Sequence, residues 1–200
     1  MKDLKFKKPT TDTVEIENNY GKFVISPLER GYGITIGNSL RRVLLSSLPG
    51  SAIVSVNIAN VVHEFTPVDG VVEDVTTIIL NLKGVVLSID NEDPNIEKYL
   101  ELSVEGPKDV FASDLVADEE VEIMNPDHYI CHINKGTLRM HMKARRGNGY
   151  TSAKQNATYT EDVNDIAIGS IYTPITRANY AVEKTRVDDS GDYDKLVLEI

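Results

Sequence analysis

The chain has 200 residues, of which 41% are hydrophobic and 26% charged, an ordinary globular composition that excludes collagen-like, low-complexity and wholly disordered chains. Lys and Arg number 21 against 31 Asp and Glu, so the formal net charge is −10 at pH 7. Because phosphate contacts dominate nucleic-acid affinity, so acidic a chain is a poor candidate for direct DNA binding, and a protein partner is favoured.

The N-terminal residues are polar and do not resemble a signal peptide, and no apolar run approaches the ~18 residues that a membrane span requires. The single cysteine, Cys131, cannot form an internal disulfide, which fits a reducing compartment. We therefore expect a cytoplasmic protein with no membrane association.

Alternating apolar residues predict a β-hairpin near the N-terminus. Val14 and Ile16 mark its first strand, Phe23 and Ile25 mark its second, and residues 18–21 supply the turn.

The next predicted element is a helix that ends at Pro49-Gly50, because the apolar residues before this pair recur at helical spacing. These residues are Ile36, Leu40, Val43, Leu44 and Leu48. Leu45 lies off this stripe, so the helix has an extra apolar flank, which indicates a second packing partner. Arg41 and Arg42 lie mid-helix, where a guanidinium can pair with the carboxylates of a partner or with an acidic side chain of the same chain.

The rest of the chain reads as mostly antiparallel strands with one more helix, which makes the fold class α+β. Strands are predicted at 54–58 and 62–65, and a helix at 71–82. Further strands are predicted at 85–89, 99–104, 121–124, 129–133, 138–144, 180–187 and 196–200, with loops at 91–95 and 145–165 and a turn at 188–192.

No catalytic or metal site is expected on this chain. The four histidines and Cys131 lack the spacing of a zinc site. The glycine pairs at 31–33 and 147–149 lack the features of a phosphate-binding loop and are interpreted as turns. The basic residues Lys143, Arg145 and Arg146 are interpreted as part of a solvated loop.

One long motif is distinctive. Residues 28–50, LERGYGITIGNSLRRVLLSSLPG, closely resemble the signature of the bacterial RNA polymerase alpha subunit and its first helix. The resemblance continues in one register over nearly the whole chain, through residues 62–65, 70–74, 79–84, 128–131, 145–150, 172–175, 179–183 and 194–200.

The resemblance implies a fold of two subdomains. Residues 1–49 and 174–200 would form a dimerisation subdomain from both chain ends, and residues 50–173 an inserted, mostly-β subdomain. It further implies a homodimer on which the beta and beta-prime subunits of DNA-directed RNA polymerase assemble. The nucleotidyltransferase chemistry and its magnesium would belong to those large subunits, with no cofactor on this chain.

The resemblance also implies roles for individual residues. Arg42 and Leu45 would contact the beta subunit, and Lys83 and Lys195 the beta-prime subunit. Dimer and core contacts would be shared by Ile36, Leu40, Val43, Leu44 and Leu48. A full alpha subunit continues past the last strand into another helix and a DNA-binding carboxy-terminal domain, so we expect a truncated subunit that does not bind DNA directly.

Two other functions remain open at this level. A small enzyme would use buried Glu73 or Asp74 with a histidine. A nucleic-acid-binding module would use Lys143, Arg145 and Arg146, and its DNA affinity would fall steeply with salt.

Overall fold

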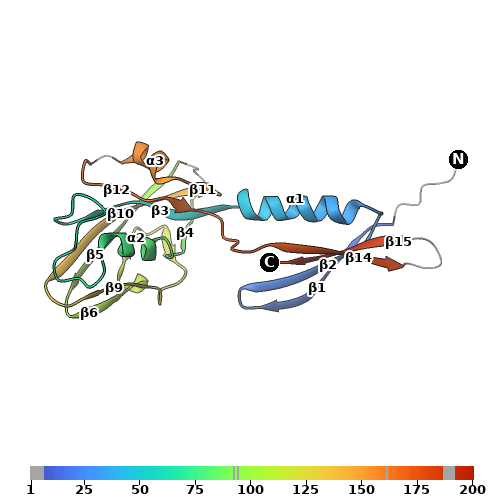
Figure 1. Cartoon of the computed structure of the whole chain (residues 1–200), viewed down its shortest axis with the longest axis horizontal. Coiled ribbons are helices and arrows are strands. Elements are labelled where there is room, and N and C mark those ends of the chain that lie inside the picture. The colour runs from blue at the N-terminus through green and yellow to red at the C-terminus, as the bar shows by residue number, and fades with distance from the viewer. Residues whose placement is uncertain (1–6, 92, 94, 161, 187–191) are drawn as a thin grey trace. The chain divides into compact units, whose positions relative to one another are not determined.

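A computed structural model describes residues 7–91, 93, 95–160, 162–186 and 192–200. The chain divides into two compact units, Met1–Leu48 with Thr173–Ile200, and Pro49–Tyr172 (Figure 1). The subdomain boundaries expected from the sequence, 49/50 and 173/174, lie one residue further along the chain. The predicted turn at 188–192 and the end of the strand at 187 fall outside the described residues, Asp192 excepted.

The first unit is a four-stranded antiparallel sheet with one helix. Its strands are β1 (Thr10–Glu17), β2 (Tyr20–Leu28), β14 (Asn179–Arg186) and β15 (Asp192–Glu199), in the order β1-β2-β15-β14, and its helix is α1 (Tyr32–Ser46). Asn18, with φ of 46°, turns the predicted hairpin. Because β2 pairs with β15, the two ends of the chain form one sheet.

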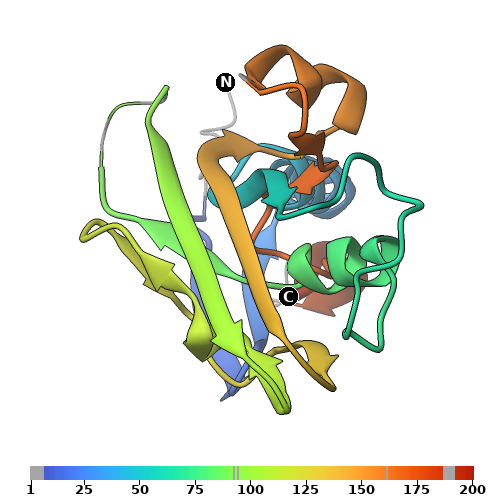
Figure 2. The same cartoon turned by 90° about the vertical axis from the view of Figure 1, so that its left-hand side faces the viewer.

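The second unit contains the larger sheet, a seven-stranded one whose main path runs β7-β5-β10-β3-β4-β8 (Figure 2). Its strands are β3 (Pro49–Ile58), β4 (Leu87–Ile89), β5 (Glu97–Glu105), β7 (Val116–Ala117), β8 (Val121–Ile123), β10 (Thr137–Asn148) and β12 (Ile166–Ala167), which pairs with β3. Two small sheets pair β6 (Lys108–Phe111) with β9 (Tyr129–Ile133), and β11 (Tyr150–Thr151) with β13 (Ser170–Ile171). The helical segments are α2 (Val75–Leu82), α3 (Ala153–Asn156) and the 3₁₀ turns Ala112–Asp114 and Ala157–Tyr159.

The main cluster of buried apolar residues lies in this second unit. Helix α2 contributes Val75, Ile78 and Leu82 to it, and burial of this face stabilises the helix although Thr76 and Thr77 have low helix propensity. The predicted α+β class with two subdomains is confirmed.

Several expected boundaries are wrong. Helix α1 ends at Ser46, so Leu48 lies outside it, and Pro49-Gly50 begin strand β3. Residues 62–65 form no strand, because β3 already pairs with β10 on one side and with β4 and β12 on the other. Part of the predicted loop at 145–165 is strand, since β10 pairs with β3 as far as Asn148.

Candidate protein-binding surface

Helix α1 contacts its own sheet with glycines rather than with its apolar stripe. Gly33 and Gly37 are its only buried residues. A Cβ atom on Gly37 would lie 2.4 Å from Cδ2 of Tyr180 and 2.9 Å from Cδ1 of Leu196, so the helix backbone lies directly on strands β14 and β15. Of the two, Gly33 was expected in a turn; it is helical, and it packs against Val182.

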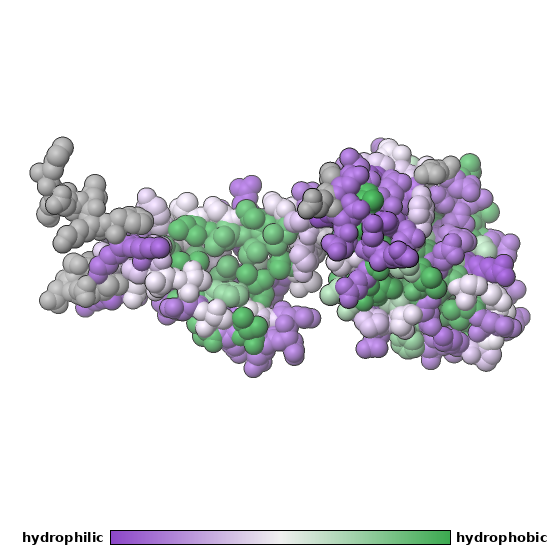
Figure 3. Space-filling model, turned by 180° about the vertical axis from the view of Figure 1, so that it is seen from behind, coloured by the Kyte–Doolittle hydropathy of each residue, from purple (hydrophilic) through white to green (hydrophobic). Residues whose placement is uncertain are grey.

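The apolar side chains of α1 consequently remain accessible in the single chain. Val43, for which core and dimer contacts were both expected, is 49% exposed and so lies outside the core of the single chain, and Ile34 is exposed as well. The other apolar residues that the sequence analysis named in this region are half-buried. They are Ile36, Leu40, Leu44, Leu45 and Leu48. Apolar side chains gather on one face of the first unit (Figure 3).

The two adjacent arginines of α1 differ in their surroundings. The Arg41 Nε donates a hydrogen bond to the backbone oxygen of Ala178, 3.0 Å away, so its guanidinium is held within the chain. Arg42 is exposed, and within the described part of the chain its side chain makes no hydrogen bond or ion pair. Together with Asn38, Ser39, Val43, Ser46 and Ser47, it lines a shallow hollow along the helix.

The two lysines expected to contact beta-prime are accessible. Lys83 is exposed and follows the last residue of α2 in the second unit. Lys195 belongs to the first unit, where its Nζ lies 2.9 Å from the Glu183 carboxylate, and it lies at an irregularity in the pairing of β15 with β2.

Lys143 of β10 is buried and Arg145 and Arg146 are half-buried, which corrects the prediction that these three residues belong to a solvated loop. Lys143 is 5% exposed and the Arg145 side chain 11%, and both lie within 3.4 Å of the Glu97 carboxylate on β5. The Arg145 guanidinium also stacks on the ring of Tyr159, 3.7 Å from its centroid. These two cations are therefore neutralised within the sheet, which argues against the nucleic-acid-binding alternative.

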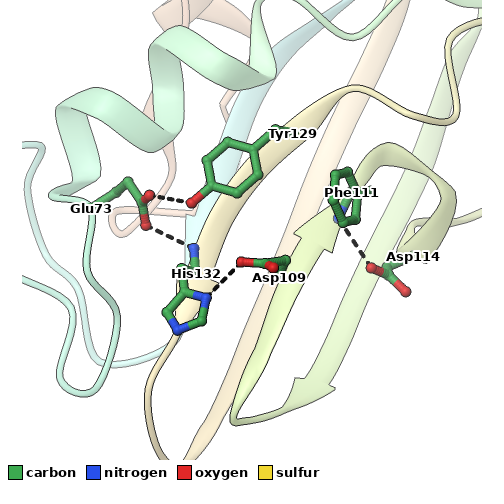
Figure 4. A network of polar contacts seen from close by, with 6 residues as sticks. All are labelled: Glu73, Asp109, Phe111, Asp114, Tyr129 and His132. Atoms are coloured by element: carbon green, nitrogen blue, oxygen red, sulfur yellow. Dashed lines mark hydrogen bonds and ion pairs between the residues drawn. The ribbon is translucent and has the colours of Figure 1, made fainter.

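The acidic residues of the enzyme alternative have structural partners, and those of Glu73 are drawn in Figure 4. Glu73 accepts hydrogen bonds from the Tyr129 hydroxyl and from the backbone N–H of His132, the second at 2.8 Å. Burial and the bond to Glu73 raise the pKa of Tyr129. Asp74 accepts a bond from the backbone N–H of Thr77 and caps α2, and hydrogen bonds with Thr77 lower the pKa of Asp74.

The nearby histidine and the lone cysteine form no metal centre. His132 Nδ1 lies 2.6 Å from Asp109, and Cys131 points to the opposite side of the strand into the core, as strand alternation predicts. In the residues that the structure describes, no three His, Cys, Asp or Glu side chains are grouped so as to hold a metal ion. The described helices include none that is long and apolar enough to cross a membrane.

Together, these features define an α+β protein that has an inserted β-rich unit and, in its other unit, a helix with an accessible face. The RNA polymerase Rpb3/RpoA insert domain family matches residues 56–173, more than half of the chain. The chain belongs to this family.

The similarity extends beyond the matched domain to the whole chain. It is 55% identical over 199 residues to DNA-directed RNA polymerase subunit alpha of Oenococcus oeni, covering 98% of this chain and 62% of that protein. The subunits of the same name from Leuconostoc mesenteroides and Limosilactobacillus reuteri are each 53% identical over 200 residues, covering 98% of this chain and 63% of theirs. The resemblance to the alpha subunit is confirmed, and the chain spans just over three-fifths of these curated relatives.

Proposed function

We propose that this chain is a non-catalytic scaffold subunit of a bacterial-type DNA-directed RNA polymerase. In this function it forms a homodimer, and the dimer binds the beta and beta-prime subunits. The nucleotidyltransferase reaction and its magnesium belong to the large subunits, and this chain holds no cofactor. The relatives named above, all alpha subunits of that polymerase, support the proposal.

The observation that carries the proposal is the open face of α1. A surface helix normally buries its apolar stripe against its own domain, whereas α1 buries only two glycines and leaves Val43 exposed. Arg42 extends from the same helix without an internal partner among the described residues. An accessible arginine beside accessible apolar groups is the composition of a protein-binding hot spot.

Capture of the beta subunit tests the proposal. Purified beta subunit is offered to the immobilised 200-residue chain and to its Arg42→Ala variant. We expect Arg42→Ala to weaken capture by ~2 kcal/mol, about thirtyfold, because truncation removes a guanidinium that would pair across the interface.

Two controls make the result specific. Arg139→Ala removes an exposed arginine from β10 in the second unit, and its capture should match that of the parent chain. Circular dichroism of each variant verifies that the fold is retained. Equal capture by the parent and by Arg42→Ala would contradict the assignment of Arg42 to the beta contact.

A further inference from the structure

Helix α1 needs polar contacts to hold it on the sheet, because a glycine face buries little apolar area. Three such contacts are present among the residues that the structure describes. At its C-terminal half, Arg41 binds the Ala178 oxygen, and the Thr173 hydroxyl donates to the Leu44 oxygen over 3.3 Å. The third contact lies at the N-terminal end of the helix and is the most deeply buried.

That third contact is made by Asp194 of β15. The residue is 7% exposed, and its Oδ2 atom accepts hydrogen bonds from the backbone N–H of Gly31 at 2.7 Å and of Gly33 at 3.3 Å. Gly31 occupies the N-cap position with φ of 89° and has no side chain to cap the helix. Asp194 thus supplies the cap from a strand 163 residues further along the chain.

The chemistry of this contact is favourable in two respects. A carboxylate at the N-terminus of a helix interacts well with the helix dipole, and a bond to an ionised acceptor is stronger than one between neutral groups. Since Asp194 lies on the sheet and Gly31 and Gly33 at the start of α1, the two bonds fix one end of the helix to the sheet. A Cβ atom on Gly33 would lie 3.1 Å from Cβ of Asp194, so a larger residue at position 33 would crowd this contact.

We infer that Asp194 is a positioning residue. It holds the start of α1 on the sheet and so fixes where Arg42 and its apolar neighbours lie on the surface. The consequence for binding rests on the proposed function. Arg42 lies ten residues beyond Tyr32, roughly 15 Å along the helix axis, so a small tilt at the N-terminal end displaces the arginine.

Amide hydrogen exchange in the isolated 200-residue chain tests, without any partner, whether Asp194 holds the start of α1 on the sheet. Asp194→Ala should speed exchange at Gly31 and Gly33 by about tenfold or more, because both amides lose their acceptor. Asp194→Asn keeps an oxygen in place and should retain most of the protection. Asp12→Ala removes an exposed aspartate from β1 and should change neither amide. Unchanged exchange in Asp194→Ala would overturn the inference.

Capture of the beta subunit tests the consequence by a double-mutant cycle. Asp194→Ala alone should weaken capture by about tenfold, and Asp194→Asn by much less. If Asp194 acts through the presentation of Arg42, the double variant with Arg42→Ala should lose little more than Arg42→Ala alone.

Additive losses in this cycle would overturn the positioning role, since they would mean that Asp194 only stabilises the fold. Failure of the proposed function would give a different result. If Arg42→Ala leaves capture unchanged, the proposed beta contact is contradicted. Amide exchange still decides whether Asp194 holds the helix on the sheet.

Discussion

Individual residues of the second unit show how strongly burial changes the role of a charge. Lys143 and Arg145 are nearly buried cations that share one partner, Glu97, which is itself 30% exposed. Removing one member of such a group costs more than an exposed ion pair contributes, because the remaining charges stay desolvated.

We therefore expect Glu97→Gln to destabilise the chain by ~1–3 kcal/mol in urea unfolding at pH 7. Glu122→Gln, on the exposed edge strand β8, is the matched control and should change the free energy of unfolding by less than ~0.5 kcal/mol. Equal effects of the two variants would show that Glu97 does not compensate these cations.

This group of charges could not be predicted from the sequence. Glu97 and Arg145 are 48 positions apart, and only the antiparallel register of β5 with β10, which places them opposite each other, brings them together. The basic residues also stand beside Gly147 and Gly149, and a glycine-rich context favours a loop interpretation. The alternation of Leu138, Met140, Met142 and Ala144 predicted this strand only as far as Ala144, whereas β10 continues to Asn148.

At the scale of elements, the two main helices differ in how well the sequence predicts them. Helix α2 was predicted because Val75, Ile78 and Leu82 form one buried stripe, although it begins at Val75 and not at residue 71 as expected. In α1 the buried face consists of Gly33 and Gly37, which an apolar pattern does not mark, and Gly33 belongs to a glycine pair that was interpreted as a turn. Because glycines and not apolar side chains face the sheet, the apolar residues of α1 remain accessible. The position of its open face was therefore only partly predictable.

Strand β9 provides a probe of the core through Cys131, which is fully buried. Burial, with a smaller effect of Glu73, raises the pKa of the Cys131 thiol to about 12. Because only the thiolate reacts, iodoacetamide at pH 8 should label the native chain very slowly and the urea-unfolded chain rapidly.

The raised pKa also sets a pH dependence for stability. The folded state binds the thiol proton more tightly than the unfolded state. The contribution of the thiol to the free energy of unfolding is therefore complete below pH ~8.5 and declines as the pH rises above that value.

The labelling experiment has a control. A Cys131→Ala, Ser88→Cys chain moves the thiol to an exposed position on β4 and should react with iodoacetamide without urea. Rapid labelling of native Cys131 would contradict the buried position of this strand.

For the whole molecule, the proposed homodimer makes a direct prediction. Light scattering of the isolated chain should give a dimer mass that falls on dilution. Val43→Glu should shift the mass to that of a monomer, because a charge would be buried in the apolar contact. Val116→Glu alters an exposed valine of the second unit and should leave the mass unchanged. A monomer at every concentration of the parent chain would contradict the proposal.

The joining of both chain ends in one sheet has a consequence for biosynthesis. Gly21 and Ile200 exchange two backbone hydrogen bonds, of 2.8 and 2.9 Å, so β2 lacks this partner until translation has passed Ile200. Residues 49–172 emerge as an uninterrupted stretch and can fold on the nascent chain, since domains fold largely as units during synthesis. The helix that carries Arg42 is thus translated well before β14 and β15, the two strands on which it packs.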